Sequence, residues 1–208
     1  FARRDGPRQE RGYHPAETGF PRTRAGRWEI AAGAVLTQNT AWINVERALD
    51  ALTAAEVESP EAVLALPAEA LATLVRPAGY FNQKSRYLRA VAEWFQATDP
   101  TLSRAPRDRA TLEAARPALL GVRGVGPETA DSVLLYAYAL PTFVIDAYTR
   151  RVLGAHGLVA PNAPYELLRA ACEASLREPT DAATVARWQE LHAVLVEEAK
   201  AARRGTRD

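Results

Sequence analysis

Cysteine, lysine and long apolar runs are scarce in this chain of 208 residues, and each shortage argues against a class of protein or reaction. The single cysteine, Cys172, cannot close an internal disulfide and cannot supply the roughly four thiolates of an iron–sulfur cluster. The three histidines lack the spacing of a zinc site. No apolar run approaches the ~20 residues that cross a bilayer, and no signal peptide is apparent. We therefore expect neither a metal site nor a membrane protein.

The composition that remains favours helices and an uneven distribution of charge. Alanine, leucine and arginine dominate, whereas β-branched residues are sparse. The length allows one large or two small domains with a substantial core. The net charge of +1 conceals +4 in residues 1–27, +3 in residues 200–208 and −6 between them. The arginine-rich ends are either solvated tails or a surface for an anionic partner.

The spacing of apolar residues predicts an all-α fold. Helices are expected over residues 28–38, 42–52 and 82–97, with further helix starts at Ser59 and Leu66. Residues 1–27 and 101–108 are expected to be irregular. Short helices are expected on both sides of Gly124, and Asp146 opens a long C-terminal helical run. Only the brief stretch 142–145 has the composition of a strand.

A glycine turn that leads into a helix is the most informative feature of the chain. Gly124 and Gly126 lack Cβ, so the backbone can adopt positive φ and a bulky group can approach closely. Pro127 has the fixed φ of a first helical residue, and an apolar stripe follows it. The turn therefore presents N–H groups at a helix start, which is a site for phosphate. Asp146 lies 20 residues after Gly126 and follows an apolar run.

Together, the turn and the spaced aspartate resemble the helix-hairpin-helix DNA glycosylase superfamily, which includes endonuclease III. Its hairpin pattern, apolar-x-Gly-apolar-Gly, is met by residues 122–126. Its essential aspartate, preceded by two apolar residues, is met by Asp146. The similarity covers roughly residues 28–200. The strings at 36–40, 126–131 and 145–151 are most similar to the type III 3-methyladenine DNA glycosylases.

The resemblance implies two helical subdomains with DNA and the active site in the cleft between them. Residues 28–140 are expected to form a six-helix barrel-type lobe with the hairpin, and residues 1–27 and 141–208 a terminal lobe. The expected partner is double-stranded DNA with a damaged base, bound by a monomer in the bacterial cytoplasm, at the nucleoid. Many endonuclease III relatives carry an iron–sulfur cluster, which Cys172 alone cannot hold.

The resemblance also implies a possible cation at the hairpin. In this superfamily the hairpin carbonyls can bind a monovalent cation when DNA is bound, and Leu120, Val122 and Val125 occupy the matching places. No other cofactor is expected.

Asp146 is the candidate catalytic residue. Its simplest structural role is a helix N-cap, and the two roles are compatible because the helix dipole favours the ionised carboxylate. Cleavage of an N-glycosidic bond builds positive charge on the sugar, as in glycoside hydrolysis. A fixed carboxylate stabilises that charge and can orient a water.

Glu128 departs from the pattern of the bifunctional relatives, which have at this place the lysine that forms a Schiff base and cuts the strand. The chain has only two lysines, Lys84 and Lys200, against 24 arginines, and an arginine stays protonated. We therefore expect a monofunctional glycosylase. Glu128 either lines the base pocket or simply favours a helix N-terminus as an acid.

The candidate DNA-binding residues fall into three groups. Arg123, Gly124 and Gly126 are expected to meet the phosphate backbone without reading sequence. Arg150 and Arg151 are either strand contacts or a solvated face. A third group, Gln38 and Asn39, occupies the place of the polar wedge that fills the gap left by an extruded base, or is merely a polar pair at a helix end.

Four further residues are candidates for the base pocket. The type III branch has two aromatic residues before a proline near the N-terminus and another after the wedge, which here become Tyr13, His14 and Trp42. Aromatic faces suit an alkylated purine because the base is a cation. Lys200 matches a pocket lysine of the family and requires a partner or neutralisation beside such a base. Ordinary core packing is the alternative for the aromatics, and a surface position is the alternative for Lys200.

The residues and the resemblance leave three functions to distinguish. The first is a monofunctional DNA N-glycosylase of base excision repair for alkylated purines, and the second is an endonuclease III-like glycosylase for oxidised pyrimidines. The third is a module that binds damaged DNA without catalysis. A cationic base leaves readily, so one aspartate and an aromatic pocket suffice for the first. Oxidised pyrimidines leave poorly, and their enzymes usually have the lysine that is missing here. A module that only binds damaged DNA would be expected to lack the catalytic aspartate, but Asp146 is present.

Overall fold

The structure is a computed structural model that describes residues 21, 23–160, 162–178 and 181–205. In these residues the chain forms helices and connecting turns, with no strand, and the predicted all-α class is confirmed. The helices are α1 (Arg24–Leu36), α2 (Trp42–Ala54), α3 (Pro60–Ala65), α4 (Ala68–Leu74), the 3-10 helix η1 (Arg76–Ala78), α5 (Phe81–Leu102), α6 (Arg109–Leu120), α7 (Pro127–Tyr138), α8 (Ala147–Ala155), α9 (Tyr165–Ser175) and α10 (Asp181–Gly205).

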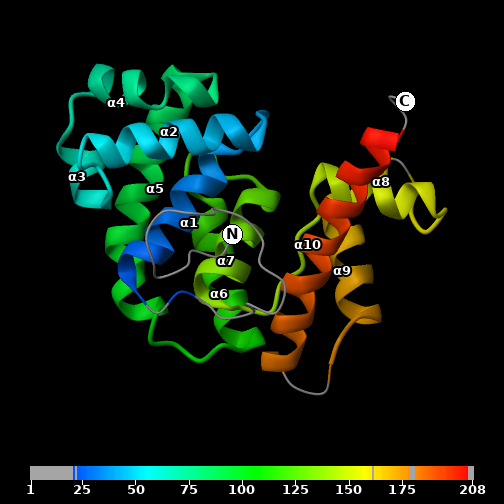
Figure 1. The fold of residues 1–208 in the computed structure, drawn as a ribbon. Helices are drawn as coiled ribbons and strands as arrows, with labels where there is room; N and C mark the ends of the chain where they lie inside the picture. The colour runs from blue at the N-terminus through cyan, green and yellow to red at the C-terminus, as the bar shows by residue number, and fades with distance from the viewer. Residues whose placement is uncertain (1–20, 22, 161, 179–180, 206–208) are drawn as a thin grey trace.

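The helices form two groups, as Figure 1 shows. In the first group, α1 packs against α5 and α7, while α3, α4 and η1 pack around α2 and α5. In the second group, α10 lies along α8, and α10 also touches α7. The helix-hairpin-helix is formed by α6, the turn at residues 121–126, and α7. The predicted bounds of the two lobes, at 27/28 and 140/141, stay a prediction.

The first helix begins earlier than its apolar pattern predicts. Thr23 is the N-cap of α1 and accepts a hydrogen bond from the amide of Gly26 (3.1 Å). Residues 24–27, which were expected to be irregular, are therefore the first turn of α1. Arg27 is buried and pairs with Asp99 on α5 at 2.6 Å. A buried arginine was invisible to hydrophobic periodicity, because its ion pair rather than apolar contact holds it inside.

The other predicted boundaries differ in smaller ways. Helix α5 continues through Pro100 to Leu102, so the loop expected from residue 101 begins two residues later. The long run expected after Asp146 is three helices, α8, α9 and α10. Residues 1–20 lie outside the described part of the chain.

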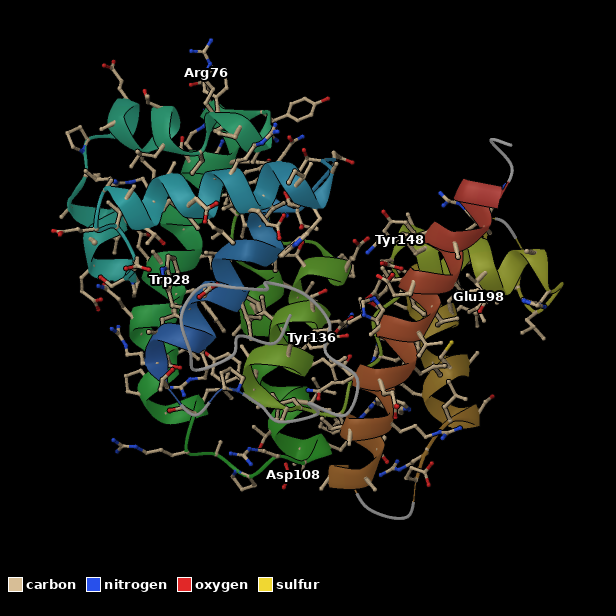
Figure 2. All side chains as sticks on the ribbon, viewed as in Figure 1. Trp28, Arg76, Asp108, Tyr136, Tyr148 and Glu198 are labelled. Atoms are coloured by element: carbon tan, nitrogen blue, oxygen red, sulfur yellow. The ribbon has the colours of Figure 1, made fainter. Side chains whose placement is uncertain are left out.

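Helix α7 is the centre of the molecule and carries parts of the candidate site. Nine of its twelve residues are buried. Aromatic side chains pack edge to face in the neighbouring helices, among them Trp28 on α1 against Phe95 on α5, with ring centres 5.5 Å apart. Figure 2 labels Trp28 on α1. Glu128 lies in the first turn of α7, and Tyr136 lies near its end, towards α10. A rigid central helix thus fixes two candidate groups relative to both helix groups.

The segment 142–145, which leads from α7 to Asp146, is buried and irregular, and no strand lies beside it in the described part of the chain. Side chains satisfy its polar groups instead. The amide of Phe143 donates to Glu173 Oε1 (3.1 Å), and the amide of Ile145 donates to Tyr165 Oη (3.4 Å). The strand that the composition of this segment suggested is therefore not formed, because side chains rather than a neighbouring strand accept hydrogen bonds from its amides.

Two buried carboxylates on either side of this segment bind it to α6, α7 and α9. Asp131 on α7 accepts hydrogen bonds from Thr142 Oγ1 (2.8 Å) and Tyr165 Oη (2.9 Å) and pairs with Arg116 (2.8 Å). On the other side, Glu173 on α9 forms ion pairs of 2.6 Å with Arg109 and with Arg169. Burial and the neighbouring charge of Asp131 raise the pKa of Tyr165, which keeps its hydroxyl protonated as a donor.

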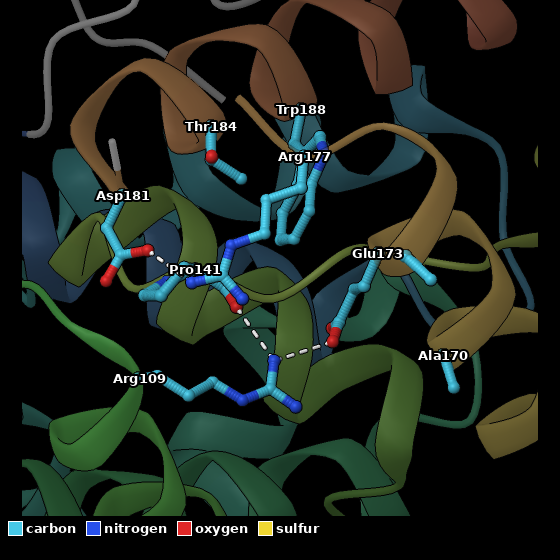
Figure 3. A pocket seen from close by; sticks show the side chains of 9 residues that line it. Arg109, Pro141, Ala170, Glu173, Arg177, Asp181, Thr184 and Trp188 are labelled. Carbon is cyan, nitrogen blue, oxygen red and sulfur yellow. Dashed lines mark hydrogen bonds and ion pairs between the residues drawn. The ribbon is translucent and has the colours of Figure 1, made fainter. Parts of the chain in front are cut away.

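A cavity of about 280 Å³ adjoins the second of these clusters (Figure 3). Arg109 reaches Glu173 there and approaches the carbonyl of Pro141, while Arg177 pairs with Asp181 at 3.2 Å. Both arginines are thus neutralised by carboxylates, and the cavity is not lined by Asp146 or Glu128. It is part of the support for the segment 142–145, separate from the candidate site.

Arg109 pairs with two glutamates, the buried Glu173 and the exposed Glu113, and we predict that the two contribute very differently to the free energy of unfolding. Glu173→Ala should lower the free energy of unfolding by about 2–4 kcal/mol, because the buried amide of Phe143 loses its acceptor and Arg109 and Arg169, both partly buried, each lose an ion pair of 2.6 Å. Glu113→Ala, which removes the exposed partner of Arg109, should cost well under about 1 kcal/mol. Urea denaturation followed by circular dichroism measures both. Equal losses would show that Glu173 does not hold the segment.

Candidate active site

Asp146 is the N-cap of α8, the structural role that its sequence position predicts. Its Oδ1 accepts a hydrogen bond from the amide of Thr149 (2.7 Å), and its backbone is extended. The side chain is 14% exposed, so one edge of the carboxylate remains accessible. The buried segment before it and the helix after it leave this carboxylate little freedom to move.

A histidine from the C-terminal helix lies against the same carboxylate. His192 Nε2 on α10 lies 3.5 Å from Asp146 Oδ2, at ion-pair distance but beyond a good hydrogen bond. Burial by itself would raise the pKa of Asp146, but the contact with His192 and the bonds from Thr149 outweigh it and hold the pKa below its ordinary value. Asp146 is therefore ionised at neutral pH.

Glu128 is the second carboxyl of the site, and its pKa is raised whereas that of Asp146 is lowered. Its side chain is accessible to solvent, yet it is surrounded by enough protein that desolvation is the main cause of its shift. Desolvation and the negative charge of Asp146 raise the pKa of Glu128 to about 7, against a smaller opposing effect of Arg150. Two neighbouring carboxyls thus differ in protonation near neutral pH, a pattern typical of acid–base sites.

The two arginines that follow Asp146 have different environments. Arg150 is half-buried, donates to the carbonyl of Ala163 (2.8 Å) and lies close enough to Glu128 to affect its titration. Arg151 is exposed, and its guanidinium lies over the ring of Tyr148 at 5.7 Å. Of the two, Arg151 is the one on the surface.

Neither lysine of the chain contacts Asp146. Lys84 is 2% exposed and donates to the carbonyls of Leu36 (2.8 Å) and Ala78 (2.7 Å), and burial lowers its pKa to about 8. Lys200 on α10 is half-exposed and pairs with Glu197 at 2.7 Å. Of the two alternatives expected for Lys200, a partner or neutralisation, the structure shows a partner, Glu197.

The hairpin turn lies against Tyr87 of α5 and is hydrogen-bonded to Gln38 of the α1–α2 turn. Gly124 has φ +86°, and a Cβ there would lie 2.1 Å from the ring of Tyr87, so only glycine fits. The amide of Gln38 donates to the carbonyl of Gly124 (2.9 Å) and to Thr129 Oγ1 (3.0 Å). Gln38 is thus a brace between the α1–α2 turn and the hairpin.

The remaining candidates at these turns are at the surface. Gly126 is the N-cap of α7, so the first amides of this helix have no partner within the helix itself. Arg123 and Asn39 are exposed, and Asn39 has a positive φ of 52°. Trp42, the first residue of α2, is half-buried against the core. Tyr13 and His14 lie outside the described residues.

The buried polar atoms of the site include a contact that the sequence did not predict. Within the described part of the chain, only three buried side-chain polar atoms lack a hydrogen-bond partner: Trp94 Nε1, Thr149 Oγ1 and His192 Nε2. Two of the three belong to residues that contact Asp146. Unsatisfied polar atoms are rare in protein interiors, so their presence on two neighbours of Asp146 supports its choice as the candidate functional carboxylate. His192 is 46 residues from Asp146 in the sequence, with no motif around it to indicate the contact.

The same described residues offer no cluster of three or more histidine, cysteine, aspartate or glutamate side chains that could hold a metal ion. A monovalent cation at the hairpin carbonyls stays a prediction. None of the described helices combines the length and apolarity needed to cross a bilayer.

Comparison with known proteins decides the family. The family model described as "HhH-GPD superfamily base excision DNA repair protein" matches residues 32–178. The chain belongs to the HhH-GPD superfamily. It is therefore a DNA glycosylase of the base excision repair family, as the hairpin and the spaced aspartate predicted.

Individual HhH-GPD relatives agree with this placement. A Methanocaldococcus jannaschii protein, provisionally named a DNA repair glycosylase, is 37% identical over 187 residues, covering 89% of this chain and 79% of that protein. The structure of an H. pylori 3-methyladenine DNA glycosylase bound to 1,N6-ethenoadenine has 25% identity and a TM-score of 0.64, covering 86% of this chain and 90% of the other. An endonuclease III–DNA covalent intermediate (19% identity, TM-score 0.65, covering 82% and 72%) shares the fold.

The raised pKa of Glu128 predicts how its removal changes stability with pH. Between its ordinary pKa of 4.5 and about 7, the folded protein binds this proton more tightly than the unfolded chain does, so its contribution to stability is lost as pH rises. Glu128→Gln should therefore gain in melting temperature relative to wild type as pH rises from 4.5 to 8. Thermal denaturation at several pH values measures the difference. A difference that is constant with pH would contradict the raised pKa.

Proposed function

We propose that this HhH-GPD protein is a monofunctional DNA N-glycosylase that releases alkylated purines such as 3-methyladenine and leaves an abasic site. The observation that carries the proposal is the environment of Asp146. The ionised carboxylate is close enough to a second carboxyl, Glu128, to raise its pKa, and Glu128 stands where a bifunctional enzyme needs an amine. The substrate class and the absence of strand cleavage follow from this environment by the chemistry below.

The role proposed for Asp146 is electrostatic. As the base departs, the sugar acquires positive charge, and a carboxylate that is already fixed and ionised stabilises that charge without reorganising. Its accessible edge can also orient an attacking water. An alkylated purine carries its own positive charge, so it leaves readily without a general acid. One fixed carboxylate is therefore sufficient for this substrate class.

Strand cleavage requires a neutral amine that can reach the sugar. Lys84 has a lowered pKa, but it is buried and both of its observed bonds bind it to backbone carbonyls. Lys200 lies eight residues after His192 on α10, about 12 Å along the helix. Neither is placed to form a Schiff base beside Asp146, which supports a monofunctional reaction.

Recognition of the base is assigned to Trp42 and Glu128. The half-buried indole of Trp42, at the first residue of α2, can attract a cationic purine by about 0.5–2 kcal/mol beyond stacking. Near neutral pH, Glu128 is present in both protonation states, so it can accept or donate a hydrogen bond at the edge of the base. The resemblance to an H. pylori 3-methyladenine DNA glycosylase supports this substrate class.

Binding to DNA is assigned to the hairpin and the turn beside it. The first amides of α7 and the exposed Arg123 suit the phosphate backbone. Because Gln38 is bonded to the hairpin and Asn39 is exposed, we assign the wedge to Asn39 and the bracing of the hairpin to Gln38. Arg151 is the arginine after Asp146 that is free to meet the strand.

If the hairpin binds DNA, a side chain added at Gly124 should weaken that binding. Gly124→Ala must move the turn or Tyr87 and places alanine at positive φ, so it should weaken binding about 5- to 100-fold on any sequence. Gly121→Ala is the control, because its Cβ would make only ordinary contacts of 3.4 Å with the end of α6. Fluorescence anisotropy with abasic-site DNA measures both. Equal affinities for the two variants would contradict a role of the hairpin in binding.

The catalytic assignment predicts that Asp146→Asn slows base release at least about 100-fold, because asparagine keeps the N-cap and the shape but removes the charge. Asp108→Asn is the matched control, since Asp108 caps α6 through the amide of Thr111 in the same way. Single-turnover release of 3-methyladenine from DNA measures both variants. A loss below about tenfold for Asp146→Asn would remove Asp146 from the reaction.

The absence of a placed amine predicts that the wild-type protein leaves the abasic strand uncut. Borohydride added during turnover should trap no covalent protein–DNA adduct. A strong trapped band, or cleavage without added alkali, would assign the protein to the bifunctional glycosylases instead.

A further inference from the structure

His192 connects three elements at the candidate active site. It lies on α10 and is 7% exposed, so its imidazole is almost entirely removed from water. Its Nδ1 lies 2.7 Å from Tyr136 Oη on α7. Its Nε2 faces Asp146 Oδ2, before α8, at 3.5 Å and has no hydrogen-bond partner. The contact at Nδ1 fixes the ring, and the contact at Nε2 is incomplete in the free protein.

The position of the protons follows from these contacts. When the imidazole is neutral, the short contact is best made by the hydroxyl of Tyr136 donating to Nδ1, and the hydrogen of the ring then lies on Nε2. The opposite tautomer would direct a lone pair of Nε2 at the carboxylate of Asp146. When the imidazole is charged, both nitrogens carry hydrogen, and Tyr136 can donate to the carbonyl of Gln189 (3.4 Å) instead. Nε2 carries a hydrogen in either state.

The two carboxylate oxygens of Asp146 therefore have different partners. Oδ1 is occupied by the amide of Thr149, as the cap of α8. Oδ2 is opposite His192 Nε2 and retains a second lone pair for the sugar or a water. Catalytic hydrogen bonds are often long in a free enzyme and shorten when the substrate is bound. A small rotation of the carboxylate would convert the 3.5 Å contact into a hydrogen bond.

We propose that His192, oriented by Tyr136, is a positioning residue that donates its Nε2 hydrogen to Asp146 Oδ2 and holds that oxygen in the reactive orientation. The contact itself is independent of the reaction, whereas its effect on rate rests on the proposed glycosylase function. The C-terminal helix α10 thus completes the active site by fixing a carboxylate that α8 alone holds through one oxygen only.

The contact can be tested without any catalysis. The chain has three histidines, so long-range ¹H–¹⁵N spectra of the imidazoles are simple, and His192→Gln identifies the signals of His192. At pH 7.5 we expect Nε2 to be protonated and the His192 signals to shift in Asp146→Asn. A ring protonated only on Nδ1, or signals that are unchanged in Asp146→Asn, would overturn the proposal.

The effect on rate is tested by two substitutions of His192. His192→Leu should slow single-turnover base release about 10- to 100-fold, the value of a hydrogen bond to a charged group, while affinity for abasic-site DNA changes less than about twofold. His192→Gln keeps an N–H donor near Nε2 and should restore the rate to within about fivefold of wild type. A purely structural role would give no such rescue.

Gln189→Met is the matched control for packing. Gln189 lies one turn earlier on α10 and donates to the carbonyl of Leu135 on α7 (2.9 Å) without contacting Asp146. This variant should lose thermal stability but keep the release rate. Equal rate losses in Gln189→Met and His192→Leu would overturn the positioning role. If the spectra show the contact but the wild type releases no base from any lesion, the proposed function fails and the contact stands.

Discussion

Two buried carboxylates, Asp131 and Glu173, hold the buried segment 142–145, and the position of the catalytic candidate depends on them. This segment has no strand beside it, so its polar groups are satisfied by side chains of α7 and α9. The carboxylates are themselves neutralised by arginines from α6 and α9. Separating the partners of a buried ion pair costs several kcal/mol of free energy. The segment is therefore rigid and holds Asp146 in a fixed position at the start of α8.

The site at the end of this segment separates the protonation of two neighbouring carboxyls. Asp146 is stabilised as an anion by a helix N-terminus and a histidine, while Glu128 is kept partly protonated by its protein surroundings and by Asp146 itself. A lysine at the place of Glu128 would pair with Asp146 and supply a nucleophile. The glutamate supplies no amine, and in its protonated state it leaves Asp146 as the single anion of the pair, which suits the proposed release of a base that departs without covalent assistance. The proposed chemistry therefore follows from one side-chain identity in the first turn of α7.

The sequence predicted features that depend on local patterns and on the family. The all-α class, the hairpin glycines and the N-cap position of Asp146 follow from spacing and backbone requirements, and the family is confirmed. Interactions over long sequence distances were not predictable. The burial of Arg27 in the first turn of α1 depends on its pair with Asp99, 72 residues away. The bonds of Gln38 to the hairpin and the contact of His192 with Asp146 have no local signal, because tertiary packing alone creates them.

The most direct test of the proposed function is identification of the base that the wild-type protein releases. Duplexes that contain 3-methyladenine, 7-methylguanine, hypoxanthine or thymine glycol are each incubated with the protein, and the free base and the strand are analysed separately. A site with one ionised aspartate and no placed amine should release the cationic purines fastest and leave every strand uncut. Preferential release of thymine glycol with strand cleavage would contradict the account and favour an oxidised-pyrimidine glycosylase.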